Sequence, residues 1–278
     1  MTEIMNDQEA AERIAQGVPI MEFEKVCIGF EQHQVLKDIT FKVAHGETRI
    51  ILGPSGGGKS VLMKLANGLL QPDSGDVRIL GWSLQKMNQR EIFAVRAHIG
   101  MVFQESALFD SLNVEDNVAY RLEEEHVDRK EIHERVVEAL CFVELEKAID
   151  KFPSELSGGM RRRVSIARAI ISKPDLILYD SPTGGLDPIT SNTIVELVVK
   201  QRDVSHTTSL LITHRLQDAF TMATHRYNQE LGHMEKIPDG GIDPSTKFLV
   251  LNEGRVVFDG ATLELTHTED PWLKYYIS

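Results

Sequence analysis

Eight residues near the start of the chain have the types and spacing of a phosphate-binding loop. They read GPSGGGKS and fit the pattern G-x-x-x-x-G-K-[ST]. Its glycines let backbone N–H groups converge on phosphate oxygens, Lys59 can reach the β and γ phosphates, and Ser60 offers a hydroxyl to Mg²⁺. A glycine-rich turn would explain the glycines but not the Lys59–Ser60 pair. The segment predicts a nucleotide site whose candidate contacts are Gly53, Pro54, Ser55, Gly56, Gly57, Gly58, Lys59, Ser60 and Val61.

A second segment, residues 156–160 (LSGGM), places a serine and two glycines at the start of a predicted helix. A helix start offers unpaired N–H groups and the positive end of the helix dipole, which favour an anion. This segment has no lysine of its own, and the first loop already supplies one side of a nucleotide. We therefore expect Ser157, Gly158 and Gly159 to cover the terminal phosphate on a partner subunit, in a dimer with ATP at the interface.

The sequence of residues 156–170, LSGGMRRRVSIARAI, resembles the signature motif of ABC-type ATPases, and the family's other motifs follow in order. The resemblance runs from about residue 21 to residue 260. It implies that Phe30 stacks on adenine, and that Gln104 binds Mg²⁺ and reports to a permease. It also implies that Asp180 is the Walker B aspartate, that Asp187 belongs to the D-loop, and that His214 is the switch histidine.

These assignments imply three sets of functional residues and two cofactors, ATP and Mg²⁺. Taken singly, each residue has an ordinary alternative: Phe30 as core, His214 as a satisfied histidine at a strand end, and the arginine run as a solvated helix face. Their order around one phosphate loop favours the functional interpretation. The candidate catalytic residues are Lys59, Gln104, Ser181 and His214, and the candidate metal ligands are Ser60, Gln104 and Asp180.

One position departs from the family pattern. The family normally has a glutamate directly after the Walker B aspartate, where it acts as general base for the attacking water, but this chain has Ser181. A serine hydroxyl is a far weaker base at neutral pH than a carboxylate, and general bases contribute typically about 10²–10⁴-fold in rate. We expect intact ATP binding and low turnover. Three alternatives remain open. The chain could hydrolyse ATP slowly with the help of His214, it could pair with a subunit that carries the glutamate, or it could use ATP mainly to hold a dimer together.

The elements that must position these residues follow an α/β pattern. A short apolar strand at 48–52 precedes the phosphate loop, and a helix at 61–70 follows it. Two further apolar strands, 176–180 and 209–213, flank a helix at 189–202, which predicts a parallel sheet. Alternating residues predict strands at 21–30 and 35–44, a hairpin at 248–260, helical stretches between 85 and 169, and a surface loop at 228–246.

The resemblance and this pattern together predict the fold class. We expect an α/β P-loop NTPase (RecA-like) core with a parallel sheet, an antiparallel β subdomain and an inserted α-helical subdomain. The expected division is an acidic leader at 1–20, an ATPase domain at 21–262 and a C-terminal tail at 263–278. Within the ATPase domain, the core covers 21–84 and 166–262, and the helical subdomain covers about 85–165.

Composition and charge limit the kinds of molecule that this chain is expected to bind. The chain has 278 residues, 42% of them hydrophobic, and a net charge of −12, which disfavours nucleic acid held by phosphate neutralisation. No stretch approaches the 18 or more apolar residues of a membrane helix, and the start lacks the pattern of a secretory signal. Cys27 and Cys141 belong to no metal-binding cluster, which fits a reducing compartment. We expect a cytoplasmic chain held at the inner membrane by a separate permease.

The substrate prediction depends on fewer residues. The methionine of LSGGM, the stretch PTGGLDPITS and the tail DPWLKYYIS are similar to the ATPases of MCE-associated, Mla-type phospholipid transporters. This resemblance implies a permease, with Leu108 and Phe109 as candidate contacts or as core, and an MCE-domain protein as partners. The alternatives are a polar-solute importer of the amino-acid type and a non-hydrolytic nucleotide-sensing module. An ABC ATPase of DNA repair or translation is disfavoured, because each motif occurs once and no long coiled coil separates them.

Overall fold

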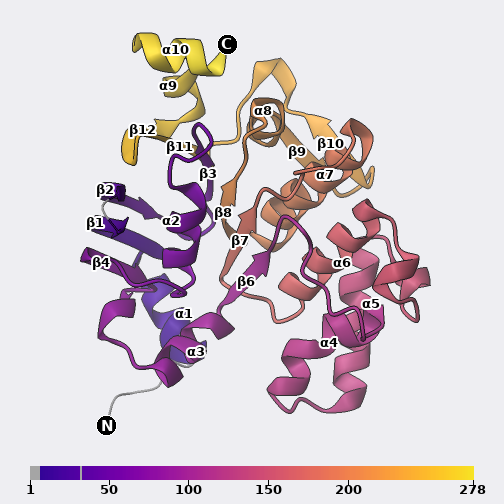
Figure 1. The fold of residues 1–278 in the computed structure, drawn as a ribbon. Helices are drawn as coiled ribbons and strands as arrows, with labels where there is room; N and C mark the ends of the chain where they lie inside the picture. The colour runs from indigo at the N-terminus through magenta and orange to yellow at the C-terminus, as the bar shows by residue number, and fades with distance from the viewer. Residues whose placement is uncertain (1–6, 32) are drawn as a thin grey trace.

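The computed structural model describes residues 7–31 and 33–278, and its centre is a six-stranded sheet (Figure 1). Its strands are β3 (Thr48–Leu52), β6 (Ile99–Val102), β7 (Leu176–Asp180), β8 (Thr208–Ile212), β11 (Thr246–Asn252) and β12 (Arg255–Ala261). They lie in the order β12-β11-β3-β8-β7-β6, and all neighbours are parallel except the β11–β12 hairpin. This arrangement confirms the predicted parallel core.

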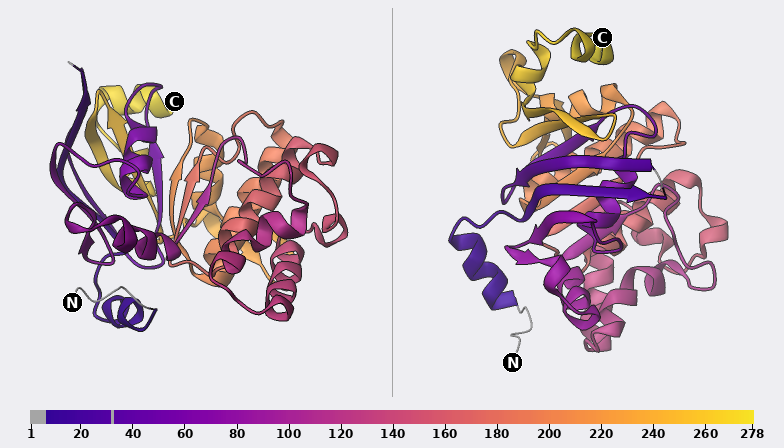
Figure 2. Two further views of the ribbon diagram at one scale, coloured as in Figure 1. Left: turned by 60° about the horizontal axis from the view of Figure 1, so that its bottom comes forward. Right: turned by 60° about the vertical axis from the view of Figure 1, so that its left-hand side comes forward.

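Alternate residues of the central strands face two different apolar layers. Ile50 and Leu52 of β3 are buried on the side of the helices, whereas Ile51 is buried against a second sheet. Such continuous apolar runs are typical of parallel strands that are covered on both faces. The left view of Figure 2 shows the result, with the six-stranded sheet between the antiparallel sheet and the helices.

The second sheet is antiparallel, as predicted, and covers the face of the core next to the phosphate loop. Its strands, β1 (Met21–Phe30), β2 (His33–Val43), β4 (Ser74–Ile79) and β5 (Trp82–Ser83), lie in the order β2-β1-β4-β5. Phe23 of β1 and Phe41 of β2 stack with ring centroids 4.8 Å apart. Their burial joins this sheet to the apolar layer of the core.

Part of the expected leader is an ordered helix. Helix α1 (Asp7–Ala15) buries Ala10, and the Arg13 guanidinium lies 3.8 Å from the centroid of the Trp82 ring. Arg13 also donates to the Leu80 carbonyl oxygen at 3.3 Å. Residues 1–6 of the leader lie outside the described residues. The composition of the leader could not show that one face of this polar helix would find an aromatic partner on β5.

Two helices, α2 (Lys59–Ala66) and α3 (Gln89–Ala97), pack in the same apolar layer as the antiparallel sheet. The other face of the core is covered by α4 (Val114–Glu124), α5 (Arg129–Phe142), α6 (Gly158–Ile170), α7 (Pro188–Ser205) and α8 (Leu216–Thr224). Short 3₁₀ turns lie at Leu84–Lys86, Glu146–Ala148 and Pro153–Glu155. Helices α4, α5 and α6 pack together as the lobe on the right of Figure 1. The range of about 85–165 also contains β6, which belongs to the sheet. The division of the chain into domains stays a prediction.

The segment 228–246 is more regular than the predicted surface loop. Strands β9 (His225–Asn228) and β10 (His233–Lys236) form a hairpin, and a 3₁₀ turn follows at Pro238–Gly240. The hairpin packs against α7. Most of the Gly, Pro and Asp residues that suggested a loop lie in the turns and irregular chain around β10, so the composition did not reveal this short strand.

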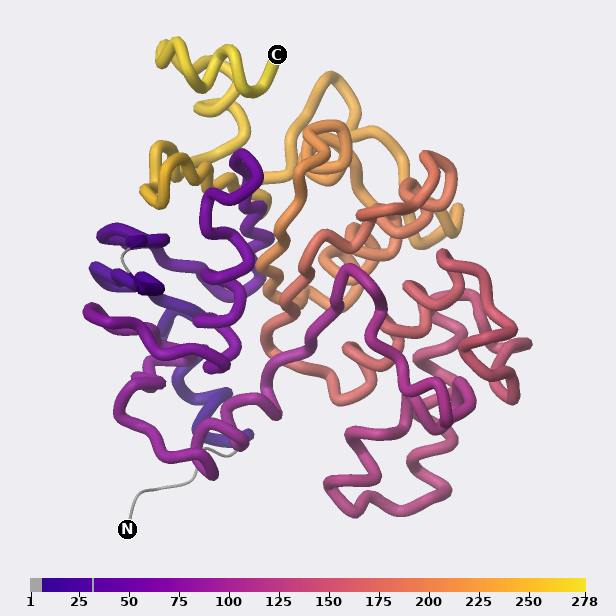
Figure 3. The backbone as a smooth tube through the Cα atoms, viewed as in Figure 1, coloured from indigo at the N-terminus to yellow at the C-terminus, as the bar shows by residue number. Residues whose placement is uncertain are grey.

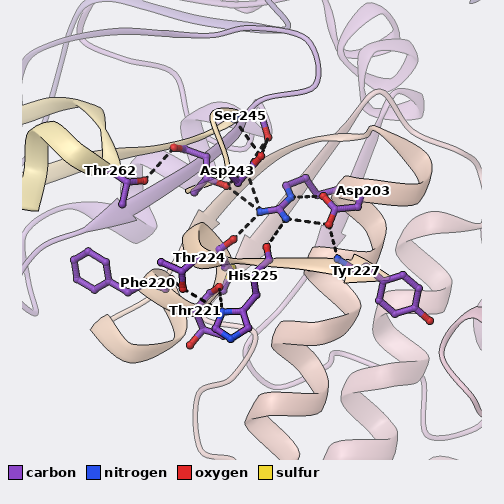
Figure 4. Close-up of polar contacts among 12 residues, drawn as sticks. Asp203, Phe220, Thr221, Thr224, His225, Tyr227, Asp243, Ser245 and Thr262 are labelled. Carbon is purple, nitrogen blue, oxygen red and sulfur yellow. Dashed lines mark hydrogen bonds and ion pairs between the residues drawn. The ribbon is translucent and has the colours of Figure 1, made fainter. Parts of the chain in front are cut away.

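Buried Arg202 of α7 attaches this segment to the core, and its partners Asp203, Asp243 and His225 are labelled in Figure 4. Its guanidinium pairs with Asp203 at 2.6 Å and with Asp243 at 3.0 Å, and it donates to the carbonyl oxygen of His225 at 2.7 Å. Asp203 also accepts from the backbone N–H of Tyr227 at 2.7 Å. Both ends of the segment are therefore tied to α7.

After β12 the chain forms two short helices, α9 (Thr262–Thr266) and α10 (Pro271–Ile277). Figure 3 shows them beyond the end of β3, at the edge of the sheet where the phosphate loop begins. Throughout residues 7–31 and 33–278, no helix has the length and apolar character needed to span a membrane.

Candidate nucleotide-binding site

The phosphate loop connects β3 to α2, and three of its glycines, Gly53, Gly56 and Gly58, have a positive φ that strains any other residue. Two of them are also closely packed. Gly53 has a φ of 146°, and a Cβ atom there would collide with the carbonyl oxygen of Leu251 on β11. Gly58, the N-cap of α2, has a φ of 93°, and a Cβ atom there would meet the side chain of Leu36. The loop thus follows the neighbouring backbone closely before it starts the helix.

Lys59 bends back over the loop. Its Nζ donates to the carbonyl oxygens of Gly53 at 2.8 Å and of Pro54 at 2.7 Å. Burial lowers the pKa of Lys59, and the nearby charge of Asp180 acts in the opposite direction. The ammonium is therefore fixed at the loop, where phosphate oxygens are its natural partners.

A pocket of about 350 Å³ lies beside this loop. It brings the four candidate catalytic residues and the three candidate metal ligands to one place, although they come from α2, from the end of β7, and from the segments after β6 and β8. Parallel strands carry their carboxyl ends to one edge of a sheet, which explains the convergence. The pocket is lined by Val35, Ser55, Gly56, Gly58, Lys59, Ser60, Val61, Gln104, Asp180, Ser181, Ile212 and His214.

The donors in this pocket suit Mg²⁺. Ser60, Gln104 and Asp180 offer a hydroxyl, an amide oxygen and a carboxylate, and Mg²⁺ prefers such hard oxygen ligands together with substrate phosphates and water. Within the described part of the chain, no cluster of three or more His, Cys, Asp or Glu residues is arranged to hold a metal on its own. A magnesium ion at this pocket would therefore depend on the nucleotide for part of its shell.

Asp180, the last residue of β7, and Ser181, which follows it, both line the pocket. Burial raises the pKa of the Asp180 carboxyl, while the Ser181 hydroxyl, which donates to Asp180 Oδ1 at 3.4 Å, lowers it. Ser181 is 8% exposed and has a φ of 48°, a backbone conformation that is uncommon outside glycine. Its side chain supplies a hydroxyl where the family resemblance would place a carboxylate.

Arg162 is a residue of the site that the sequence analysis missed. It is 4% exposed, and its guanidinium donates to the carbonyl oxygens of Ser181 at 3.2 Å and Pro182 at 2.8 Å, and also to that of Gln104. Burial lowers its pKa. One side chain thus ties the segment that carries Gln104 to the end of β7.

The sequence did contain a signal for this role. Arg162 lies three, four and seven residues before Ser165, Ile166 and Ala169, all of which are buried. That spacing marks the inward face of a helix. The three consecutive arginines, residues 161–163, suggested a solvated helix face. Because of that interpretation, the inward position of Arg162 was overlooked.

The segment that the sequence predicts as a second anion site packs next to the start of α7 and does not line this pocket. Ser157 caps α6 by accepting from the N–H of Met160 at 3.2 Å, and a Cβ atom on Gly159 would collide with Thr190. Asp187 caps α7 by accepting from the N–H groups of Ile189 and Thr190, each at 3.0 Å. Ser157, Gly158, Gly159 and Asp187 do not line the pocket of the same subunit.

Phe30 also does not line the pocket. It ends β1, pairs with His33 across the hairpin and is 46% exposed, so it is not a core residue. Val35 of the adjoining strand does reach the pocket. Gly53, Pro54 and Gly57 contribute to the loop through their backbones rather than through the pocket wall.

Comparison with known proteins places this geometry in a family. The family model described as ABC transporter matches residues 36–184. Protein TRIGALACTOSYLDIACYLGLYCEROL 3, chloroplastic, of Arabidopsis thaliana is 35% identical over 92% of this chain and 73% of its own length. The intermembrane phospholipid transport system ATP-binding protein MlaF of Escherichia coli is 37% identical over 69% of this chain and 72% of its own length. The "Probable ribonucleotide transport ATP-binding protein mkl" of Mycobacterium leprae is 38% identical over 76% of this chain and 60% of its own length.

A solved structure agrees in fold. A dimeric ATP-binding cassette in a post-hydrolysis state, bound to ADP and Pi, superposes with a TM-score of 0.72 at 27% identity and covers 87% of this chain and 98% of that one. The phosphate loop, the pocket at the carboxyl edge of the sheet and the relatives all lead to one assignment. This chain is a P-loop ATPase and belongs to the ABC transporter family.

Proposed function

We propose that this chain is the ATP-binding subunit that powers a lipid transporter, acting with a separate permease at the cytoplasmic face of the inner membrane. The observation that carries the proposal is the convergence of the phosphate loop, Gln104, Asp180, Ser181 and His214 on one pocket. ATP and Mg²⁺ are the proposed ligands. Lys59 and the loop N–H groups hold the phosphates, Ser60, Gln104 and Asp180 hold the metal, and Phe30 stacks on the base.

ATP binding is the first test. We expect wild-type chain to bind MgATP and Lys59→Ala to bind it at least about tenfold more weakly, because a charge-assisted hydrogen bond to phosphate is lost. Lys130→Ala, which changes an exposed lysine of α5 that does not line the pocket, is the matched control. Equal affinity of Lys59→Ala and wild-type chain, measured by calorimetry, would refute the site.

The proposed working unit is a head-to-tail dimer. Ser157, Gly158, Gly159 and Asp187 do not line the pocket of their own subunit, so they are available to close the pocket of a second one. The structural relative described as dimeric and bound to ADP and Pi supports this arrangement. Each nucleotide then lies between the phosphate loop of one subunit and the start of α6 of the other.

The proposed permease contact is a second hollow, of about 400 Å³, next to Gln104. Phe103, Phe109 and Tyr120 line it and are 36%, 43% and 41% exposed. Leu108, the other candidate contact, packs partly against the core of the helical lobe. Phe109 is the better candidate for contact with a short amphipathic segment of a permease.

Phospholipid or another envelope lipid is the proposed cargo, with an MCE-domain protein as a further partner. The relative named as an intermembrane phospholipid transport protein supports this, as do the sequence features of the tail. The relative named for ribonucleotide transport supports a second candidate, a polar-solute importer.

Purification of the assembled complex can distinguish these candidates. Affinity-tagged chain, produced in its own host and extracted with mild detergent, should retain a permease, an MCE-domain protein and bound phospholipid. A complex that contains a periplasmic solute-binding protein and no phospholipid would refute the lipid proposal. A chain that binds ATP but hydrolyses none of it in a single-turnover assay would instead be a sensing module.

A further inference from the structure

The C-terminal helix α10 is joined to the phosphate loop by one hydrogen bond. The backbone N–H of Gly53 donates to the phenol oxygen of Tyr276 at 2.9 Å, across 223 positions of sequence. Figures 1 and 2 show α10 at the end of the molecule where β3 leads into the loop. The hydroxyl of a residue in the tail thus contacts the first residue of the nucleotide site.

Gly53 is the point of the loop at which this contact has most effect. Its backbone lies against Leu251, and its carbonyl oxygen accepts from Lys59 Nζ at 2.8 Å. The N–H and the C=O of Gly53 belong to the two peptide groups that flank one freely rotating Cα. A partner that fixes the N–H side therefore restricts the carbonyl that holds Lys59.

Tyr276 is itself held in place. Its ring stacks on Trp272, one helical turn earlier, with centroids 5.2 Å apart and planes 6° apart. Leu273 is 3% exposed, and Asp270 caps the helix by accepting from the N–H of Leu273 at 2.9 Å. Burial raises the pKa of Tyr276, so the phenol stays protonated and neutral. The hydroxyl is a fixed, uncharged acceptor rather than a mobile one.

We propose that Tyr276 is a positioning residue for ATP binding, which holds Gly53 so that the phosphate loop keeps its binding conformation. This inference rests on the proposed nucleotide site. Without the hydroxyl, Gly53 samples other orientations, and Lys59 with it. The apparent affinity for ATP then falls in proportion to the fraction of loops that remain competent.

Tyr276→Phe tests this in the full chain, because it removes the hydroxyl and keeps the ring. The expected result is a rise in the Kd for MgATP of about three- to tenfold, the range expected when one hydrogen bond is lost. Tyr275→Phe is the matched control, since that side chain is 82% exposed. Its Kd should equal that of wild-type chain.

A second readout reports on the contact without any nucleotide. Amide hydrogen exchange at Gly53 should be faster in Tyr276→Phe than in wild-type chain or Tyr275→Phe. An unchanged exchange rate, or an unchanged Kd with only a lower melting temperature, would overturn the positioning role. If wild-type chain binds no MgATP, the proposed function fails and this inference fails with it. If wild-type chain and Tyr276→Phe bind equally well, only this inference fails.

Discussion

At the scale of single residues, we expect the position after Asp180 to limit the rate of ATP hydrolysis. Ser181 occupies the place where the family resemblance implies a general base, and it lines the pocket beside Asp180. A carboxylate there would be partly buried, and burial raises the pKa of such a group toward the range useful for a base. We therefore expect the chain to bind the nucleotide and to lack the group that would deprotonate water.

Ser181→Glu should therefore raise the single-turnover rate of ATP hydrolysis by about 10²–10⁴-fold. The backbone at this residue already has a positive φ in wild-type chain, so glutamate adds little new strain. Ser181→Ala is the control and should leave the rate close to that of wild-type chain. A purified wild-type homodimer that already hydrolyses ATP rapidly would refute the expectation of slow turnover.

The ion pairs of Glu22 should make the stability of the antiparallel sheet depend on pH. Lys42 and Arg78 hold the pKa of Glu22 below 4.5, against an opposing effect of burial. Because the folded pKa is lowered, the stabilisation is fully present above 4.5 and is lost as the pH falls through the folded pKa. These contacts join three strands, β2, β1 and β4.

Glu22→Gln should lower the free energy of unfolding at pH 7, and the difference from wild-type chain should shrink below pH 4.5. Urea titrations of both proteins at a series of pH values measure this difference in the free energy of unfolding. Glu24→Gln is the control and should show a smaller difference, because the Glu24 side chain is 50% exposed and pairs with Arg78 alone among the residues that the structure describes. A Glu22→Gln difference that stays constant down to pH 3 would contradict the assigned pairing.

At the scale of elements, Arg202 determines whether the β9–β10 segment stays attached to α7. Arg202→Met should lower the free energy of unfolding by about 3–5 kcal/mol, because Asp203 and Asp243 would be left without their buried partner. Arg226→Met is the control on the same hairpin; its pair with Glu235 lies at the surface, where solvent screens it, so the loss should be clearly smaller. Equal losses in the two variants, measured by urea denaturation, would contradict this account.

The elements that the sequence predicted correctly are those with strong local patterns. Strand β3, the hairpin of β11 and β12 and the helices α5 and α7 carry apolar periodicity or clear turn residues, and motif order located the residues of the pocket. What could not be predicted depends on distant partners. Arg162 donates to carbonyl oxygens of two other segments, and the Arg13 guanidinium lies over the ring of Trp82. Gly53 donates to Tyr276, which is 223 positions away in the sequence.

At the scale of the whole molecule, the separation of the two anion sites predicts association driven by ATP. MgATP should convert the chain from monomer to dimer in analytical ultracentrifugation, and slow hydrolysis should keep the dimer together for long periods. Lys59→Ala should remain a monomer under the same conditions, because it lacks the bound nucleotide that joins the subunits. A dimer that forms equally well without nucleotide would refute this coupling.

The bonds from Lys59 to its own loop have a consequence for ligand selection. The ammonium has two carbonyl acceptors within its own loop, so an anion that binds there has to compete with them. A single weakly charged oxygen gains little by that exchange, whereas the charged oxygens of a triphosphate form stronger hydrogen bonds than the carbonyls they replace. The loop thus discriminates by competition, and small anions that are abundant in the cell are poor competitors for it.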